Sequence, residues 1–256
     1  MARTPQRVSP MPATPPVALV TGSARRIGAT IARRLHAEGY DLALHYRGAA
    51  AEMQALAIEL ESTRPGSVLT LQADLSEFDR LPELVAQTVG RFGRMDALVN
   101  NASSFQPTPV GTTTPQQWDA LFASNARAPF FLAQAAAPHL KATRGAIVNL
   151  VDIYAERPLA GHTVYCMAKA ALLMATKSLA LELAPDVRVN AVAPGAILWA
   201  ENETSEAKQQ AMLARTPLAR TGTAEEIAEA VRWLLRDATY VTGQVIRVDG
   251  GRMLAG

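Results

Sequence analysis

The sequence predicts one α/β domain: a doubly wound parallel sheet of about seven strands with helices on both faces. From residue 17 onward, short runs rich in β-branched residues and leucine alternate with amphipathic helical stretches. Such alternation gives parallel strands joined by helical crossovers that cover both sides of the sheet. The chain of 256 residues is 49% hydrophobic and shows no break in composition that would mark a second domain. We therefore expect a single domain over residues 17–256.

Each element is expected from its own stretch of sequence. The strands should occupy residues 17–22, 41–46, 67–76, 96–102, 145–151, 187–195 and 243–251. Helical patterns occur at 25–39, 50–63, 82–93, 123–140 and 165–184. The stretch 196–238 holds two more helical patterns and no strand. Because ligands bind beyond the carboxyl ends of the strands in such a sheet, we expect a substrate loop at about 196–215.

Composition argues against several classes of protein. The formal net charge is +2, and Arg3 and Arg7 account for both units, so a nucleic-acid or membrane-surface footprint is not indicated. No apolar run approaches the ~18 residues of a membrane span. Cys166 is the only cysteine, which excludes an internal disulfide and fits a cytoplasmic location. Residues 1–16 contain five prolines and no apolar stretch typical of a secretory signal, so we expect a disordered tail.

A glycine-containing turn follows the first strand and opens the first helix. It reads TGSARRIG, with Gly22 and Gly28 at its ends and Arg26 where a middle glycine might stand. The free N–H groups and positive dipole of a helix N-terminus favour a phosphate at this place. Such a turn can also be purely structural, so the pattern alone leaves both interpretations open.

The end of the second strand indicates which dinucleotide would bind. Folds that bind NAD usually place an acid there for the ribose 2′-hydroxyl, whereas this chain has Arg47 and no acid before Glu52. Arg47 and Arg26 could hold a 2′-phosphate between them, which favours NADP, although both could be solvated surface charges. After the third strand, Asp74 could accept from the adenine amino group or cap the next helix.

The fifth strand and the helix after it carry the residues for proton transfer. Tyr165 and Lys169 are four positions apart and so share one helix face. Asp152 lies thirteen positions before Tyr165, at the end of the strand. An anion there would raise the pKa of the phenol, whereas the Lys169 ammonium would lower it. The function of the aspartate is therefore the central question that the sequence raises.

These motifs together resemble the short-chain dehydrogenase/reductase family. They are TGSARRIG, NNAS at 100–103, Asn125, the Tyr165 and Lys169 pair, and APG at 193–195. The resemblance covers residues 17–256 and implies a single Rossmann domain, a nicotinamide cofactor and a homotetramer. Asp152 stands where the family usually has serine. That departure, with Arg26 in the glycine turn and Phe105 in the loop after NNAS, is similar to the pteridine reductase branch.

The resemblance implies a role for each matching residue. It implies a catalytic set of Asp152, Tyr165, Lys169 and Asn125. It implies that the cofactor, NADPH, contacts Gly22, Arg26, Ile27, Tyr46, Arg47, Asp74, Leu75, Asn101, Ala102, Ser103, Tyr165, Lys169, Pro194 and Gly195. It implies that a pterin or folate contacts Arg26, Ser103, Phe105, Asp152 and Tyr165, with Phe105 stacking on the ring. No metal is implied. Ala49 stands where the branch often has a serine, so one bond to the 2′-phosphate would be missing.

The expected mechanism follows from the chemistry of the substrate. Tyr165 would donate a proton to a ring nitrogen, Lys169 would bind the nicotinamide ribose and lower the pKa of the phenol, and Asn125 would hold a water. Asp152, through water, would supply the proton for a fully oxidised pterin. An aspartate in place of serine would repel the oxyanion of a reduced ketone by several kcal/mol in a shielded site, whereas reduction of a C=N bond forms no oxyanion.

Three other functions are compatible with parts of the sequence. The alternatives are a carbonyl reductase acting on a ketone or sugar, a non-catalytic NADP-binding regulator, and an enoyl reductase, whose branch spaces the Tyr and Lys more widely. The helix at 165–184 is apolar on nearly every face, as is its alanine-rich predecessor at 123–140. A helix of this kind must be covered all round, so we expect a homotetramer that packs on these two helices.

Overall fold

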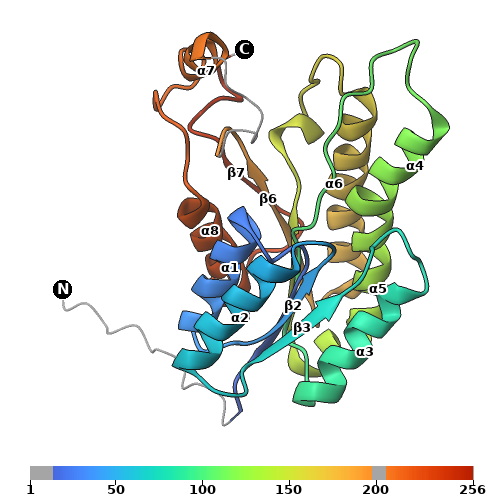
Figure 1. The fold of residues 1–256 in the computed structure, drawn as a ribbon, viewed down its shortest axis with the longest axis vertical. Helices are drawn as coiled ribbons and strands as arrows, with labels where there is room; N and C mark the ends of the chain where they lie inside the picture. Colours follow the sequence, from blue (N-terminus) through green and yellow to red (C-terminus); the bar gives the residue numbers. More distant parts are fainter. Residues whose placement is uncertain (1–13, 198–205, 256) are drawn as a thin grey trace.

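The computed structural model describes residues 14–197 and 206–255 and confirms the predicted sheet. Seven strands form one sheet in the order β3-β2-β1-β4-β5-β6-β7, and every neighbouring pair is parallel (Figure 1). The strands are β1 (Val17–Val20), β2 (Asp41–Tyr46), β3 (Val68–Gln72), β4 (Ala97–Asn100), β5 (Ala146–Leu150), β6 (Arg188–Pro194) and β7 (Val245–Val248). The strand order reverses direction between β1 and β4, which creates a crevice at their carboxyl ends.

Helices cover the two faces of this sheet. They are α1 (Arg26–Ala37), α2 (Ala50–Thr63), α3 (Arg80–Phe92), α4 (Pro115–Phe122), α5 (Ala128–Thr143), α6 (Thr163–Leu183), α7 (Glu206–Leu213) and α8 (Ala224–Arg236). Alternate strand residues face opposite cores: Ala18 and Val20 pack with α1, α2 and α8, whereas Leu19 packs with α3, α5 and α6. The period of two along each strand therefore separates the two layers of helices.

The stretch expected as one helix at 123–140 is divided in the structure. The α4 helix begins at Pro115, with Thr114 and Gln117 forming a capping box at its start. A single π-helical turn over Ala123–Arg127 then joins α4 to α5. The expected boundary was therefore wrong, because the sequence pattern carries no signal for the wider turn around Asn125.

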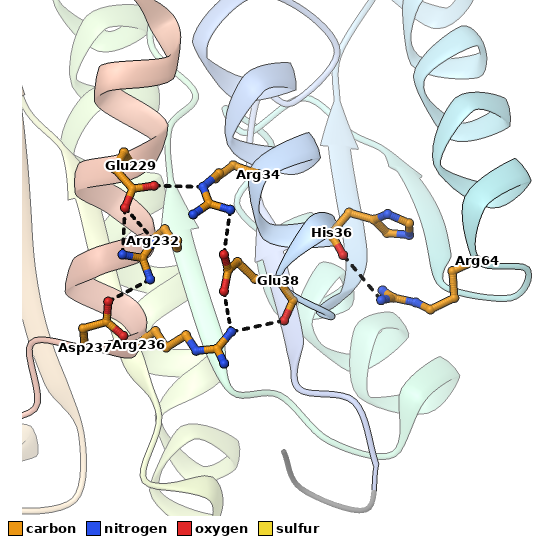
Figure 2. Close-up of polar contacts among 8 residues, drawn as sticks. All are labelled: Arg34, His36, Glu38, Arg64, Glu229, Arg232, Arg236 and Asp237. Atoms are coloured by element: carbon orange, nitrogen blue, oxygen red, sulfur yellow. Dashed lines mark hydrogen bonds and ion pairs between the residues drawn. The ribbon is translucent and has the colours of Figure 1, made fainter. Parts of the chain in front are cut away.

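Ion pairs connect α1 and α8 on the face of the sheet that those helices cover (Figure 2). They join Arg34 to Glu38 and Glu229, Arg236 to Glu38, and Arg232 to Glu229 and Asp237. Several of these side chains are more than a third exposed, so each pair adds little stability. The network joins the two helices toward the end of α1 that is remote from the predicted site.

The ends of the predicted domain differ slightly from expectation. Thr14 and Pro16 already bond to the body, because Thr14 accepts from Arg94 and the Pro16 carbonyl accepts from the Asp41 N–H. The rest of the expected tail, residues 1–13, lies outside the described residues. The expected substrate loop lies outside them at 198–205, and its later part contains α7.

The α6 helix is the one helix of the described chain that is long and apolar enough to cross a membrane by length and composition. Half of its apolar window is buried inside the protein, as in core helices that pass the same test. It packs against β6 and the segment after β5, and it carries Tyr165 and Lys169. We therefore describe α6 as a core helix of this domain.

Candidate active site

A cleft opens where the carboxyl ends of β4, β5 and β6 meet the start of α1. Nine of the residues predicted to bind cofactor or substrate line it: Arg26, Ile27, Asn101, Ser103, Asp152, Tyr165, Lys169, Pro194 and Gly195. Leu150, Val151 and Ile197, which the sequence analysis did not single out, complete its wall. The cleft lies beside the reversal of strand order, which is where ligands bind in open α/β sheets.

Close packing of backbone explains the glycines around this cleft. A Cβ at Gly28 would lie 2.2 Å from the Gly22 carbonyl oxygen, and one at Gly195 would lie 2.6 Å from the Asp249 Cα. Gly22 itself has φ +63°, and its Cβ would approach the Ala102 Cα to 2.8 Å. Gly22 and Gly28 therefore let the turn pack against the residues that follow β4, and Gly195 lets the end of β6 approach the backbone after β7.

The arginine and acid predicted for the adenine end lie at the ends of β2 and β3. Arg47 is three-quarters exposed, and its guanidinium lies 3.9 Å from the Asp74 carboxylate. Asp74 accepts from the Ser76 N–H at 2.8 Å, so it stabilises the turn after β3, and α3 begins later, at Arg80. Nearby, Tyr46 is half-buried and Leu75 is buried in the core beside α3. Neither of these two side chains lines the cleft.

The closest contact within the catalytic set joins Tyr165 to Asp152. The Tyr165 hydroxyl donates to the Asp152 Oδ2 at 2.7 Å, and the Tyr154 N–H donates to the other oxygen at 3.0 Å. Burial and the Asp152 carboxylate together raise the pKa of the phenol well above its usual value. Burial also raises the pKa of Asp152, although its two hydrogen bonds and Lys169 oppose this. The phenol is therefore held in its protonated form, as a proton donor requires.

Lys169 is fully buried next to this pair. Its ammonium donates to the Leu150 carbonyl at 2.8 Å and lies 5.8 Å from the centre of the Tyr165 ring. Burial lowers the pKa of Lys169 to about 8, and the Asp152 charge opposes that shift. We expected Lys169 to lower the pKa of the phenol. In the structure burial and the Asp152 carboxylate decide the direction, and the pKa of the phenol is raised.

Asn125 is completely buried, and its amide group is bonded within the protein. The Nδ2 atom donates to the Leu121 carbonyl at 3.0 Å and to the Ser104 carbonyl at 2.8 Å. The Oδ1 atom accepts from the Ser103 hydroxyl at 2.7 Å. The bond to the Leu121 carbonyl falls within the region of the π turn, which explains why the helix is irregular there. Asn125 thus holds Ser103 at the edge of the cleft, while both amide hydrogens are already donated.

Phe105 lies beside the cleft and belongs to a group of aromatic rings. Its ring stacks on His162 with centroids 4.5 Å apart and an angle of 11°, and it lies at 90° to the Tyr165 ring with centroids 4.8 Å apart. The side chain is 55% exposed and does not line the cleft. The sequence predicted a ring at this place, but it did not indicate that His162 supports one of its faces.

Tyr154 and Arg252 form a second contact that the sequence analysis missed. The Arg252 guanidinium donates to the Tyr154 hydroxyl at 3.2 Å, and the Arg252 charge favours the ionised form of Asp152. These two residues are 98 positions apart, and neither belongs to a motif. The position of the Arg252 guanidinium next to Tyr154 therefore could not be predicted from the sequence and is known only from the folded structure.

Comparison with known proteins gives one family match and several relatives. A family model described as Enoyl-(Acyl carrier protein) reductase matches residues 22–252, so it spans the glycine turn, the cleft and α6. Pteridine reductase 1 of Leishmania tarentolae is 42% identical over an alignment 282 positions long, which covers 94% of this chain and 97% of that protein. The 3-oxoacyl-(acyl-carrier-protein) reductase FabG of Staphylococcus aureus is 37% identical over 239, which cover 91% and 96%.

The contact between Asp152 and Tyr165 predicts a change in titration. In Asp152→Asn the negative charge is gone, so the pKa of the Tyr165 phenol should fall because phenolate no longer faces a carboxylate. Ultraviolet difference spectra of tyrosinate formation against pH measure this, with the same spectra in Tyr165→Phe identifying the contribution of Tyr165. An unchanged or higher phenol pKa in Asp152→Asn would mean that the carboxylate does not act on the phenol.

Proposed function

Because this chain belongs to the short-chain dehydrogenase/reductase family, we propose that it reduces dihydropterins, or the pterin ring of dihydrofolate, to the tetrahydro form. As a member of that family it is an oxidoreductase, and its cofactor is NADP(H). The observation that carries the proposal is the hydrogen bond between Asp152 and Tyr165. The likeness to a pteridine reductase over nearly the whole chain supports it.

The charge of Asp152 is the reason to choose a C=N substrate over a carbonyl. A carboxylate about 4 Å from a developing alkoxide would oppose it by about 4 kcal/mol at an effective dielectric constant of 20. Reduction of a C=N bond places a proton on nitrogen and forms no such anion. A pterin also presents an edge rich in N–H donors, which a carboxylate can accept. Asp152 therefore favours the pterin and disfavours the ketone.

The chemistry of the residues in and near the cleft suits a dinucleotide. The start of α1 presents N–H groups and the positive end of the helix dipole for the pyrophosphate, and Arg26 and Arg47 supply cations for the 2′-phosphate. Asn101, Pro194 and Gly195 line the part of the cleft next to Lys169, where the nicotinamide riboside would lie. When bound, NADPH supplies the hydride for the pterin carbon.

Proton supply is the part of the reaction that the protein performs. Tyr165 donates the phenolic proton to the ring nitrogen, and Asp152, bonded to the phenol at 2.7 Å, then takes up a proton from solvent water and passes it to the phenolate. The raised pKa of Asp152 favours a carboxyl that can hold this proton transiently. For a fully oxidised pterin, Asp152 supplies the first proton through water. Ser103, held by its hydrogen bond to Asn125, lines the same cleft as Tyr165.

In the proposed complex the Phe105 ring stacks on the substrate. His162 stacks on the Phe105 ring and Tyr165 lies at right angles to it, so a flat substrate would contact the part of the ring that is exposed. Stacking of this kind adds about 1 kcal/mol beyond burial. A pterin held between Phe105 and the nicotinamide would lie within reach of the Tyr165 hydroxyl.

A carbonyl reductase is the second candidate, and the relatives that reduce 3-oxoacyl groups favour it. That activity requires Asp152 to be protonated or turned away from the reacting oxygen. The family model is described as an enoyl reductase, but that branch spaces its Tyr and Lys more widely than the four positions between Tyr165 and Lys169. A regulator without activity has no need of a buried phenol, carboxyl and ammonium in contact.

We also propose that the protein is a homotetramer that packs on α5 and α6. Both helices expose large apolar side chains, namely Phe130, Met167, Met174 and Leu181. An apolar helix surface of this kind is usually covered by another subunit. The family resemblance points to the same two helices.

The choice between dihydropterin and carbonyl substrates tests the proposed function. NADPH should be oxidised rapidly with dihydrobiopterin or dihydrofolate and slowly with a panel of ketones and a 3-oxoacyl thioester, as followed by loss of nicotinamide absorbance. Tyr165→Phe should lower kcat by about 100-fold or more because the proton donor is lost, with NADPH affinity retained. Tyr154→Phe, a phenol near the site but outside the proton path, should keep most of the activity. Turnover with ketones alone would contradict the proposal.

The second prediction concerns assembly. Light scattering should give the mass of a tetramer for the native protein, and Leu181→Glu should reduce it because a charge would be buried between subunits. Ile58→Glu is the matched control, since Ile58 is 63% exposed on α2 and Leu181 is 82% exposed on α6. A native monomer, or equal effects of the two variants, would refute packing on α6.

A further inference from the structure

A buried histidine at the end of β2 supports the turn that leads into α1. His45 is 2% exposed and lies under this turn. Its Nδ1 atom accepts from the Gly22 N–H at 3.2 Å, and its carbonyl accepts from both the N–H and the hydroxyl of Ser23 at 2.9 and 3.1 Å. On its other side, Nε2 lies 3.1 Å from the Ala73 carbonyl at the end of β3. One residue therefore connects the turn to two neighbouring strands.

These partners fix the protonation state of the imidazole. The Gly22 N–H can only donate, so Nδ1 must be the unprotonated nitrogen, and Nε2 must carry the hydrogen that the Ala73 carbonyl accepts. Protonation of Nδ1 would place two donors against each other beside an imidazole that is almost completely buried. The contact with Gly22 thus exists only while His45 is neutral.

The groups around His45 do little to stabilise the positively charged imidazolium form. Ala43, on the same face of β2, and the buried side chains of α3 nearby, Leu81, Leu84 and Val85, are apolar. The turn contributes Gly22 and Ser23, which do not titrate. Asp74 after β3 raises the pKa of His45, as does the Ala73 carbonyl, but burial outweighs both and the pKa is lowered. Arg47, two positions further along β2, is paired with Asp74.

We propose that His45 is a positioning residue for the cofactor: the neutral imidazole holds Gly22, and with it the start of α1, in the conformation that binds the NADPH phosphates, so that its protonation weakens NADPH binding. The proposal rests on the use of NADP(H) and not on the pterin substrate. The negative charge of the phosphates acts in the opposite sense, because it attracts an imidazolium. The geometry predicts that loss of the Gly22 contact is the larger effect.

The test measures NADPH dissociation constants by fluorescence between pH 5.5 and 8.5. In His45→Asn the Oδ1 atom can replace Nδ1 as acceptor for Gly22 but does not titrate. Its affinity should match the native protein at neutral pH, and the native Kd should rise above it progressively as the pH falls. Protonation of the NADPH 2′-phosphate affects the native protein and His45→Asn equally. The difference between their dissociation constants at each pH therefore reports His45 alone. In His45→Leu the Gly22 N–H is left without an acceptor, and affinity should fall by roughly tenfold at all pH values.

His36→Leu is the matched control. His36 is also buried, at 5% exposed, and its imidazole bonds to Ser67, but it lies in the last turn of α1 (Figure 2), whereas Gly22 precedes the first turn of that helix. This variant should keep the native Kd for NADPH and its native pH dependence. Equal weakening in His36→Leu and His45→Leu would show that any buried histidine supports binding through general stability, and would overturn the proposal.

Nitrogen-15 spectra of the native protein test the same idea without a variant. They should show His45 as the neutral Nε2–H tautomer, titrating below the ~6.5 of a free imidazole. A protonated Nδ1 at neutral pH would overturn the proposal, as would NADPH binding that tightens in acid relative to His45→Asn. Failure of pterin reduction would leave these readouts unchanged, so the two proposals fail separately.

Discussion

The hydrogen bond between the Tyr165 phenol and the Asp152 carboxylate is the interaction on which the site depends. It can form because β5 ends at the same edge of the sheet that the first turn of α6 contacts. Both groups are largely buried, so each acts on the other with little screening, and the phenol keeps its proton. A serine at position 152 would leave that phenol with a neutral partner. Aspartate at position 152 therefore suits a product that is protonated on nitrogen, whereas serine would suit an alkoxide next to Tyr165.

The rest of the cleft is held by buried polar groups that are bonded within the protein. Lys169 donates to the Leu150 carbonyl, Asn125 bonds two carbonyls, and His45 accepts from Gly22. An unpaired polar group at such depth would cost about 1–3 kcal/mol, so these bonds specify one arrangement of the strand ends. The glycines act in the same way, because a Cβ at Gly28 would collide with the Gly22 carbonyl. Cofactor binding and proton transfer thus use one rigid edge of the sheet.

The sequence predicted the parts of this structure that depend on local pattern. Strand β2 and helix α2 begin and end where expected, because hydrophobic periodicity is a property of neighbouring residues. The Tyr165 and Lys169 pair was predictable from helix geometry, and Asp152 from its place at a strand end. The π turn at Asn125, the support of Phe105 by His162 and the contact of Tyr154 with Arg252 were not. Each of these joins residues far apart in the chain or depends on a bond to a particular carbonyl, which no local pattern reports.

The substrate preference of Asp152→Ser directly measures what the charge at position 152 does. The ratio of kcat/KM for a dihydropterin to that for a ketone should be measured with NADPH in the native protein and in this variant. We expect the ratio to fall by at least tenfold, because the carboxylate that suits the C=N bond is lost and the neutral hydroxyl does not repel an alkoxide. A ratio that stays the same or rises would contradict the claim that the charge at position 152 selects the substrate.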